Sequence, residues 1–171
     1  ASITVINDST IFYTNSGAFG VKRDVTVYLS WCSTNNDSIF AWPNPFPNKP
    51  GAPYKNLNYL NSKYWDVYEA LHAGPVLIKD SKIRVSVEEE VFFSSPVAGV
   101  QPRSAVGYTH DNYLILIVID GRQVNSRGVY LEELAIIVFI ELPSNFHSTL
   151  TLDTSSVSML IVVASPRGLV V

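Results

Sequence analysis

Polar residues that could carry out chemistry flank apolar segments at three places in this chain. Asp120-Gly121-Arg122 follows the run Tyr113–Ile119, Asp153-Thr154-Ser155-Ser156 lies between two apolar segments, and Arg103 leads into a third. Side chains at the ends of rigid strands can project into a cleft and contact a ligand there. Each segment also has a simpler explanation. Asp, Gly, Ser and Thr are common in β-turns, and an arginine before a strand is usually solvated or ion-paired.

The other titratable residues give weaker signals. Glu88-Glu89-Glu90 could supply a general acid and a general base, although a solvated turn explains such a carboxylate run better. His72, His110 and His147 do not have the spacing of a metal site. Cys32 is the only cysteine, which excludes an intramolecular disulfide, and it has no obvious histidine partner for nucleophilic catalysis. We therefore predict no metal ion and no cofactor.

Strands must position most of these residues, because β-branched and aromatic residues dominate the readable pattern. The predicted class is α+β, with a mixed, largely buried β-sheet and few helices. The predicted strands cover Ser2–Ile6, Val25–Trp31, Val76–Ile78, Ile83–Val87, Tyr113–Ile119, Leu150–Leu152 and Val157–Val163.

Three segments differ from this strand pattern. Residues 32–64 include four prolines between Trp42 and Pro50, which predicts a long surface loop or insertion rich in proline and aromatic residues. The segment Lys63–His72 has apolar residues at helical spacing, which predicts a short amphipathic helix. Val129–Leu142 fits either a buried helix or a segment that favours strand, since its second half is apolar on all sides.

Length and composition limit the possible functions. The 171 residues, 47% of them hydrophobic and 16% charged, predict a single domain spanning residues 1–171. A net charge of −3 gives no basic surface for nucleic acid. The longest apolar runs are far shorter than the roughly 20 residues of a transmembrane helix, so we predict no membrane span.

Four segments follow one another in the middle of the chain: Ala73–Asp80 (AGPVLIKD), Pro102–Gly107 (PRSAVG), Leu116–Arg122 (LIVIDGR) and Ser126–Ala135 (SRGVYLEELA). This succession resembles the phosphodiester glycosidase family, which includes the enzyme that uncovers mannose 6-phosphate and bacterial secreted or exopolysaccharide-associated domains. The resemblance implies hydrolysis of the bond between a sugar's anomeric carbon and a phosphodiester, a glycan or sugar-phosphate ligand, and an extracellular or periplasmic location.

The implied reaction assigns roles to the candidate residues. A phosphate ester leaves as a stable anion, so the site needs cations around the phosphate and a carboxylate near the anomeric carbon. On this resemblance, Arg103 and Arg122 hold the phosphate, with Arg127 as a further candidate. Asp153 then acts at the anomeric carbon, and Asp120 is a second catalytic residue that orients Arg122 or a water molecule.

Two family motifs are altered here. The family's Asn-Gly-Gly corresponds to Asn7-Asp8-Ser9, and its Leu-Asp-Gly-Gly-Gly-Ser-Ser corresponds to Leu152-Asp153-Thr154-Ser155-Ser156. The asparagine, leucine, aspartate and serines of these motifs are kept, and of these Asn7, Ser155 and Ser156 are predicted to bind substrate. The lost glycines would have let the backbone approach a ligand closely.

These departures leave three interpretations. The chain is an active glycosidase, or a non-catalytic carbohydrate-binding or structural domain on the same fold, or a family core altered and selected for folding. The second interpretation draws on the aromatic residues of the loop, because aromatic faces stack on sugar rings. The same side chains could instead anchor the loop to the domain. They are Phe40, Trp42, Phe46, Tyr54 and Tyr59.

Overall fold

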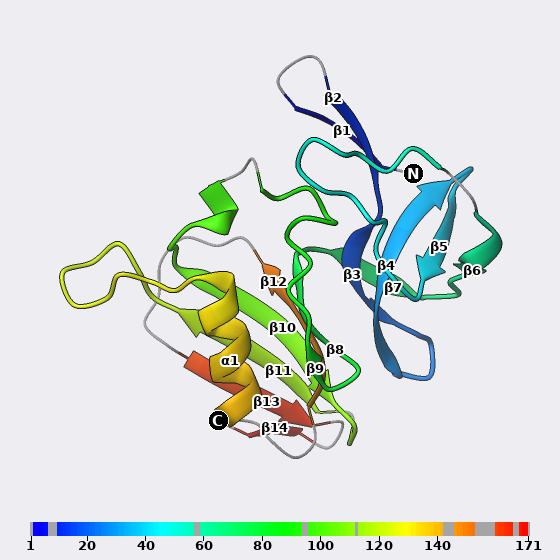
Figure 1. Ribbon diagram of the computed structural model, residues 1–171. Coiled ribbons are helices and arrows are strands. Elements are labelled where there is room, and N and C mark those ends of the chain that lie inside the picture. The colour runs from blue at the N-terminus through cyan, green and yellow to red at the C-terminus, as the bar shows by residue number, and fades with distance from the viewer. Residues whose placement is uncertain are drawn as a thin grey trace. The chain divides into compact units, whose positions relative to one another are not determined.

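A computed structural model describes most of the chain and divides it into two compact units (Figure 1). The first unit consists of Ala1–Pro75 and Ser86–Pro96, and the second of Val76–Val85 and Val97–Val171. The single domain expected for residues 1–171 stays a prediction. The described residues are 2–6, 10–56, 59–93, 96–111, 113–141, 146–152, 160–165 and 168–170.

The first unit contains a two-stranded hairpin and a five-stranded antiparallel sheet in the order β6-β5-β4-β3-β7. Trp31, Phe12 and Leu29 are among its buried side chains. Its elements are β1 (Ser2–Ile6), β2 (Thr10–Thr14), β3 (Ser16–Val21), β4 (Val27–Asn35), β5 (Ser38–Trp42), the 3-10 helix η1 (Tyr59–Asn61), β6 (Lys63–Tyr64) and β7 (Glu69–His72).

The long loop predicted for residues 32–64 was wrong in its first part. Strand β4 continues to Asn35 and pairs with β5, so the irregular proline-rich segment begins only after Trp42. The turn between the two strands is Asn36-Asp37, and both residues have positive φ angles, 45° and 58°. This is the two-residue turn that matches the twist of a β-hairpin, and Asn and Asp tolerate it well.

The helix predicted for Lys63–His72 was also wrong, because this segment forms β6 and β7. Strand β7 pairs with β3, and Tyr68 donates its backbone N–H to the Val21 carbonyl at 2.8 Å. Trp65 is buried, and a Cβ added to Gly20 would meet its ring at 2.6 Å. Close packing of Trp65 over a glycine in the sheet therefore decides the local structure against the helical spacing.

The second unit contains a seven-stranded sheet in the order β14-β13-β11-β10-β12-β8-β9, and helix α1 packs against β8 and β9 (Figure 1). All seven residues of β10 are buried. The elements are β8 (Val76–Lys79), β9 (Lys82–Ile83), β10 (Arg103–Thr109), β11 (Leu114–Ile119), α1 (Leu131–Glu141), β12 (Phe146–Leu152), β13 (Leu160–Ser165) and β14 (Gly168–Val170). A second 3-10 helix, η2 (Pro96–Ala98), lies where the chain passes from one unit to the other.

The ambiguous segment Val129–Leu142 is a helix in the structure, α1. Its buried residues Leu131, Leu134 and Val138 recur at helical spacing, whereas Ile140 on another face is exposed. Within the described ranges, no helix combines the length and apolar character that crossing a membrane would require.

The mainly-sheet α+β class is confirmed, with two corrections. Every pairing among the described strands is antiparallel, so the predicted mixed sheet was wrong. Short hairpin turns such as Asp80-Ser81 join several neighbours, and such turns can only join antiparallel strands. The strand predicted for Ile83–Val87 ends at Ile83, and a turn over residues 87–91 follows.

Candidate functional site

Four neighbouring strands of the second unit, β12, β10, β11 and β13, begin or finish at the same end of its sheet. Leu152 of β12 pairs with Ser104 of β10, Ser104 pairs with Val118 of β11, and Val118 pairs with Leu160 of β13. Arg103 precedes Ser104, and Asp120 follows the end of β11. The sheet register therefore places Arg103 and Asp120 at the same end of the sheet, where β12 also ends.

Arg103 is only 5% exposed, and its guanidinium bonds to the backbone. Its Nη2 donates to the carbonyls of Val97 at 2.6 Å and Gly99 at 2.5 Å, and its Nε donates to the carbonyl of Val129 at 3.3 Å. A buried guanidinium needs such acceptors because its charge is costly to desolvate. These bonds hold the segment before β10 and the segment before α1 around Arg103.

Asp120 is also buried and organises the turn after β11. Its Oδ1 accepts from the backbone N–H of Gly121 at 2.7 Å and from Nε2 of Gln123 at 3.1 Å. Its backbone carbonyl accepts from Oγ of Ser126 at 2.7 Å. The predicted turn after Tyr113–Ile119 is thus present, and its aspartate is held in one orientation.

Two glycines allow this turn to lie directly on the chain before β10. Gly128 has a φ of 88°, and a Cβ placed on it would lie 2.4 Å from the Gln101 carbonyl oxygen. A Cβ on Gly121 would lie 2.8 Å from the Pro102 backbone nitrogen. Backbone therefore packs against backbone here, and larger residues at 121 or 128 would push the turn away from Arg103.

Arg122 and Arg127 are exposed cations in the same turn. The Arg122 side chain donates from Nε to Oε1 of Gln101 at 3.0 Å, and its Nη2 contacts the same oxygen. Arg122 has a φ of 58°, so the backbone aims this side chain from an uncommon conformation. Arg127 forms an ion pair with Glu133 at 2.6 Å.

Four predicted site residues, Asn7, Asp153, Ser155 and Ser156, lie outside the described residues. Among the residues that the structure does describe, no group of histidine, cysteine, aspartate and glutamate side chains could hold a metal ion.

The solvated turn predicted for Glu88-Glu89-Glu90 was wrong for Glu90, which is 4% exposed. Its Oε1 accepts from Nε1 of Trp31 at 2.9 Å and from Oγ of Ser86 at 2.5 Å, and its Oε2 accepts from the backbone N–H of Gly17 at 2.7 Å. Donors from three segments thus replace water around the carboxylate. Only the turn at residues 87–91 was visible in the sequence, because the donors lie up to 73 positions away.

Cys32 lies in the same unit and is buried. Burial, together with the nearby Glu90 carboxylate, raises the pKa of its thiol to about 11. Because the thiolate is the reactive form, this environment disfavours a nucleophilic role, in agreement with the sequence interpretation.

The aromatic residues of the proline-rich loop pack mainly against one another. Trp42 and Phe46 are buried in edge-to-face contact, with ring centroids 5.5 Å apart, and Tyr54 packs on Phe46 at 5.1 Å. Tyr59 contacts both Phe40 and Trp42. These contacts favour the anchoring role that the sequence left open as one alternative.

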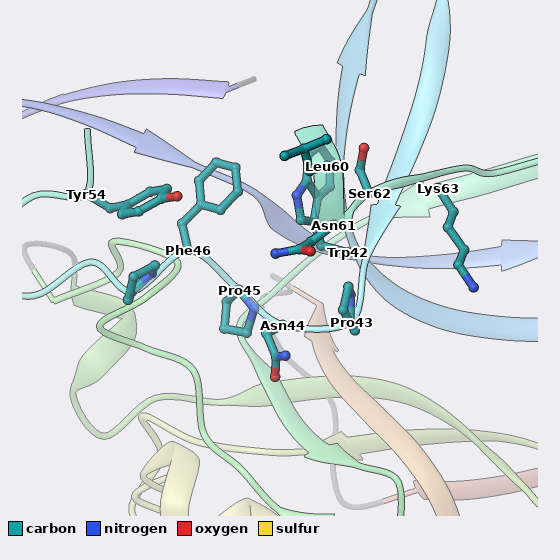
Figure 2. Close-up of a pocket in the computed structure, with 11 residues that line it drawn as sticks. Trp42, Pro43, Asn44, Pro45, Phe46, Tyr54, Leu60, Asn61, Ser62 and Lys63 are labelled. Atoms are coloured by element: carbon teal, nitrogen blue, oxygen red, sulfur yellow. The ribbon is translucent and has the colours of Figure 1, made fainter. Parts of the chain in front are cut away.

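An open pocket of about 580 Å³ lies beside this aromatic cluster, wholly within the first unit (Figure 2). Two buried asparagines, Asn15 and Asn48, hold its walls, and sequence analysis did not single them out. Asn15 lies between Thr14 and Ser16 and Asn48 follows a proline, and neither context distinguishes them from other asparagines of the chain.

Comparison with known proteins supports the resemblance. Residues 2–167 match a family model described as phosphodiester glycosidase, which is nearly the whole chain. The match spans all four segments on which the resemblance was based. No protein with a curated description matches the chain significantly.

Proposed function

The chain belongs to the phosphodiester glycosidase family, and on this premise we propose that it hydrolyses the bond between a sugar's anomeric carbon and a phosphodiester. Water adds to the anomeric carbon, the bond from that carbon to the phosphate oxygen breaks, and the phosphate leaves as a monoester. The proton lost by water passes to a carboxylate or to the leaving phosphate. Because this leaving group is a stable anion, the site must supply mainly cations and one well-placed carboxylate.

The observation that carries the proposal is that candidate site residues lie at one end of the sheet in the second unit. Arg103 pairs with Ile119, the residue before Asp120, and Leu152, the residue before Asp153, pairs with Ser104 at the same end of the sheet. The register thus supports a site to which β10 and β11 both contribute, at the end of the sheet where β12 ends.

We assign different roles to Arg122 and Arg103, the two arginines at this end of the sheet. Arg122 is exposed and charged, so we propose that it binds the phosphate. The Arg103 guanidinium donates to three carbonyls, which supports a positioning role in which Arg103 shapes the turn that carries Asp120.

The remaining assignments follow the family resemblance. Asp153 stabilises the anomeric carbon or activates water, Asp120 orients the Arg122 turn or a water molecule, and Asn7, Ser155 and Ser156 contact the substrate. We also extend the proposal to an extracellular or periplasmic location.

The test is incubation with a sugar 1-phosphodiester, with the anomeric proton followed by NMR. We expect release of the free sugar. Asp153→Asn should abolish release with little change in melting temperature, and Arg122→Ala should lower kcat/KM about 100-fold. Arg23→Ala is the matched control, because Arg23 is an exposed arginine of the first unit.

An unchanged rate in Asp153→Asn would refute the assignment of that carboxylate. Binding of the phosphodiester without release would replace the glycosidase proposal with the non-catalytic carbohydrate-binding domain.

A further inference from the structure

We propose that the pocket beside the proline-rich loop of the first unit binds a sugar unit of a glycan. The ligand class rests on the proposed function. The site itself does not, because all its lining residues lie between Trp42 and Lys63, in the unit that holds neither Arg103 nor Asp120.

The lining has the two features that sugar binding requires. Half-buried Tyr54 and exposed Pro47 and Leu60 offer apolar surface for the C–H faces of a pyranose ring. Asn61 is exposed at the end of η1, and Figure 2 shows its amide pointing into the pocket. An amide can donate to one sugar hydroxyl and accept from another, which gives a polar partner beside the apolar part of the lining.

The pocket is preorganised by buried side chains beneath it. Asn15 accepts the backbone N–H of Phe46 at 2.7 Å and donates to the carbonyl of Asn44 at 3.2 Å. Asn48 accepts the backbone N–H of Tyr54 at 2.7 Å. Three lining residues are therefore fixed by hydrogen bonds before any ligand arrives, so binding requires little additional ordering of the loop.

The opposite end of the Asn48 amide ties the loop to the rest of the first unit. Its Nδ2 donates to the carbonyls of Tyr13 at 2.8 Å and Glu89 at 3.0 Å. The loop is thus a rigid wall and not a free surface segment, although its sequence reads as irregular.

The charge of the pocket lining disfavours a cationic ligand. None of the described residues that line the pocket is acidic, and the one charged lining residue is Lys63. Its side chain extends away from the aromatic residues, at the rim (Figure 2). A neutral sugar fits the interior, and an anionic group attached to it could approach the Lys63 ammonium.

The experiment is a titration of the full ¹⁵N-labelled chain with the disaccharide of N-acetylglucosamine, which contains no phosphodiester. We expect saturable shifts of the Asn61 side-chain amide and the Trp42 indole N–H. The Trp31 indole N–H, bonded to buried Glu90, should not shift. Asn61→Ala should weaken binding about fivefold, the loss expected for one hydrogen bond.

Asn56→Ala is the matched control, because Asn56 is exposed in the same loop but does not line the pocket. No shifts, or equal affinity in Asn61→Ala and the wild type, would overturn the proposal. So would saturable binding of an aromatic probe such as indole with no binding of the disaccharide. Because the disaccharide contains no phosphodiester to hydrolyse, these outcomes do not depend on whether the candidate site of the second unit is catalytic.

Discussion

Glu90 in the first unit and Arg103 in the second are both buried charged side chains, and the two charges are stabilised in different ways. Glu90 in the first unit accepts from a backbone N–H, an indole N–H and a hydroxyl. Arg103 in the second unit donates to three backbone carbonyls. Both side chains are at most 5% exposed, so each depends on protein groups in place of water.

The difference lies in how far apart the partners are in the chain. Glu90 bonds to residues 73 and 59 positions away, in β3 and β4, whereas the Arg103 partners lie 4, 6 and 26 positions away. Glu90 therefore fastens the turn at residues 87–91 to the sheet of the first unit. Arg103 fastens two turns beside its own strand. Removing Glu90 should consequently cost more stability than removing Arg103.

The largest expected effect is that of Glu90→Ala, which leaves the Trp31 indole N–H and the Gly17 backbone N–H buried without this acceptor. We expect a loss of about 3–5 kcal/mol in the free energy of unfolding. All three tryptophans, Trp31, Trp42 and Trp65, lie in the first unit, so tryptophan fluorescence during urea denaturation reports on that unit.

Glu90→Gln is the matched control. It keeps the shape and one acceptor oxygen, and we expect about half the loss of the alanine variant. The rate at which Cys32 reacts with a thiol reagent gives a second measure of opening in this unit. A Glu90→Ala protein with wild-type stability and wild-type Cys32 protection would show that the carboxylate does not hold the unit together.

The next effect is that of Arg103→Met, for which we expect a loss of about 2–3 kcal/mol from the second unit. The only α-helix among the described residues, α1, lies in this unit, so circular dichroism at 222 nm follows it. Arg103→Lys should recover little, because an ammonium lacks the fork that reaches several carbonyls.

This variant also separates positioning from phosphate binding. If Arg103 positions the turn, the transition at 222 nm should fall to lower urea concentration while the tryptophan transition stays in place. Wild-type stability with a large loss of kcat/KM would instead make Arg103 a phosphate ligand, as the family resemblance first suggested.

Where sequence reasoning succeeded, the deciding interactions were local. The strand that ends in Asp120-Gly121 was visible as an apolar run closed by a turn, and the structure has β11 there. The β4–β5 hairpin was missed, although its turn residues Asn36 and Asp37 carry a local signal. The prolines that follow suggested a loop strongly enough to hide it.

Where it failed, the deciding interactions were distant in the chain. No local pattern indicates that Trp31 and Gly17 will supply donors to Glu90, or that Trp65 will pack over Gly20 and turn a helical spacing into strands. The candidate site likewise has one part that the sequence predicted and one part that it did not. Arg103 and Asp120 were selected as residue types, but the carbonyls around Arg103 come from loops whose courses the sequence does not specify.

The smallest effect concerns Glu133, a half-buried carboxylate at the surface, which contrasts with buried Glu90 and Arg103. Its Oε2 accepts the Tyr130 backbone N–H at 2.9 Å at the start of α1, and its Oε1 pairs with Arg127. The Tyr130 bond first, and the Arg127 bond second, lower the pKa of this carboxyl below its ordinary value. A lowered folded-state pKa means that the stabilisation is complete above the unfolded pKa and is lost as pH falls through the folded one.

Between about pH 5 and pH 3, α1 should therefore unfold at lower urea concentration as acid is added. Glu133→Gln should weaken this dependence at 222 nm, whereas Glu132→Gln, an exposed carboxylate in the same helical turn, should preserve it. Equal acid sensitivity in the two variants would mean that the helix terminus gains nothing from the Glu133 charge.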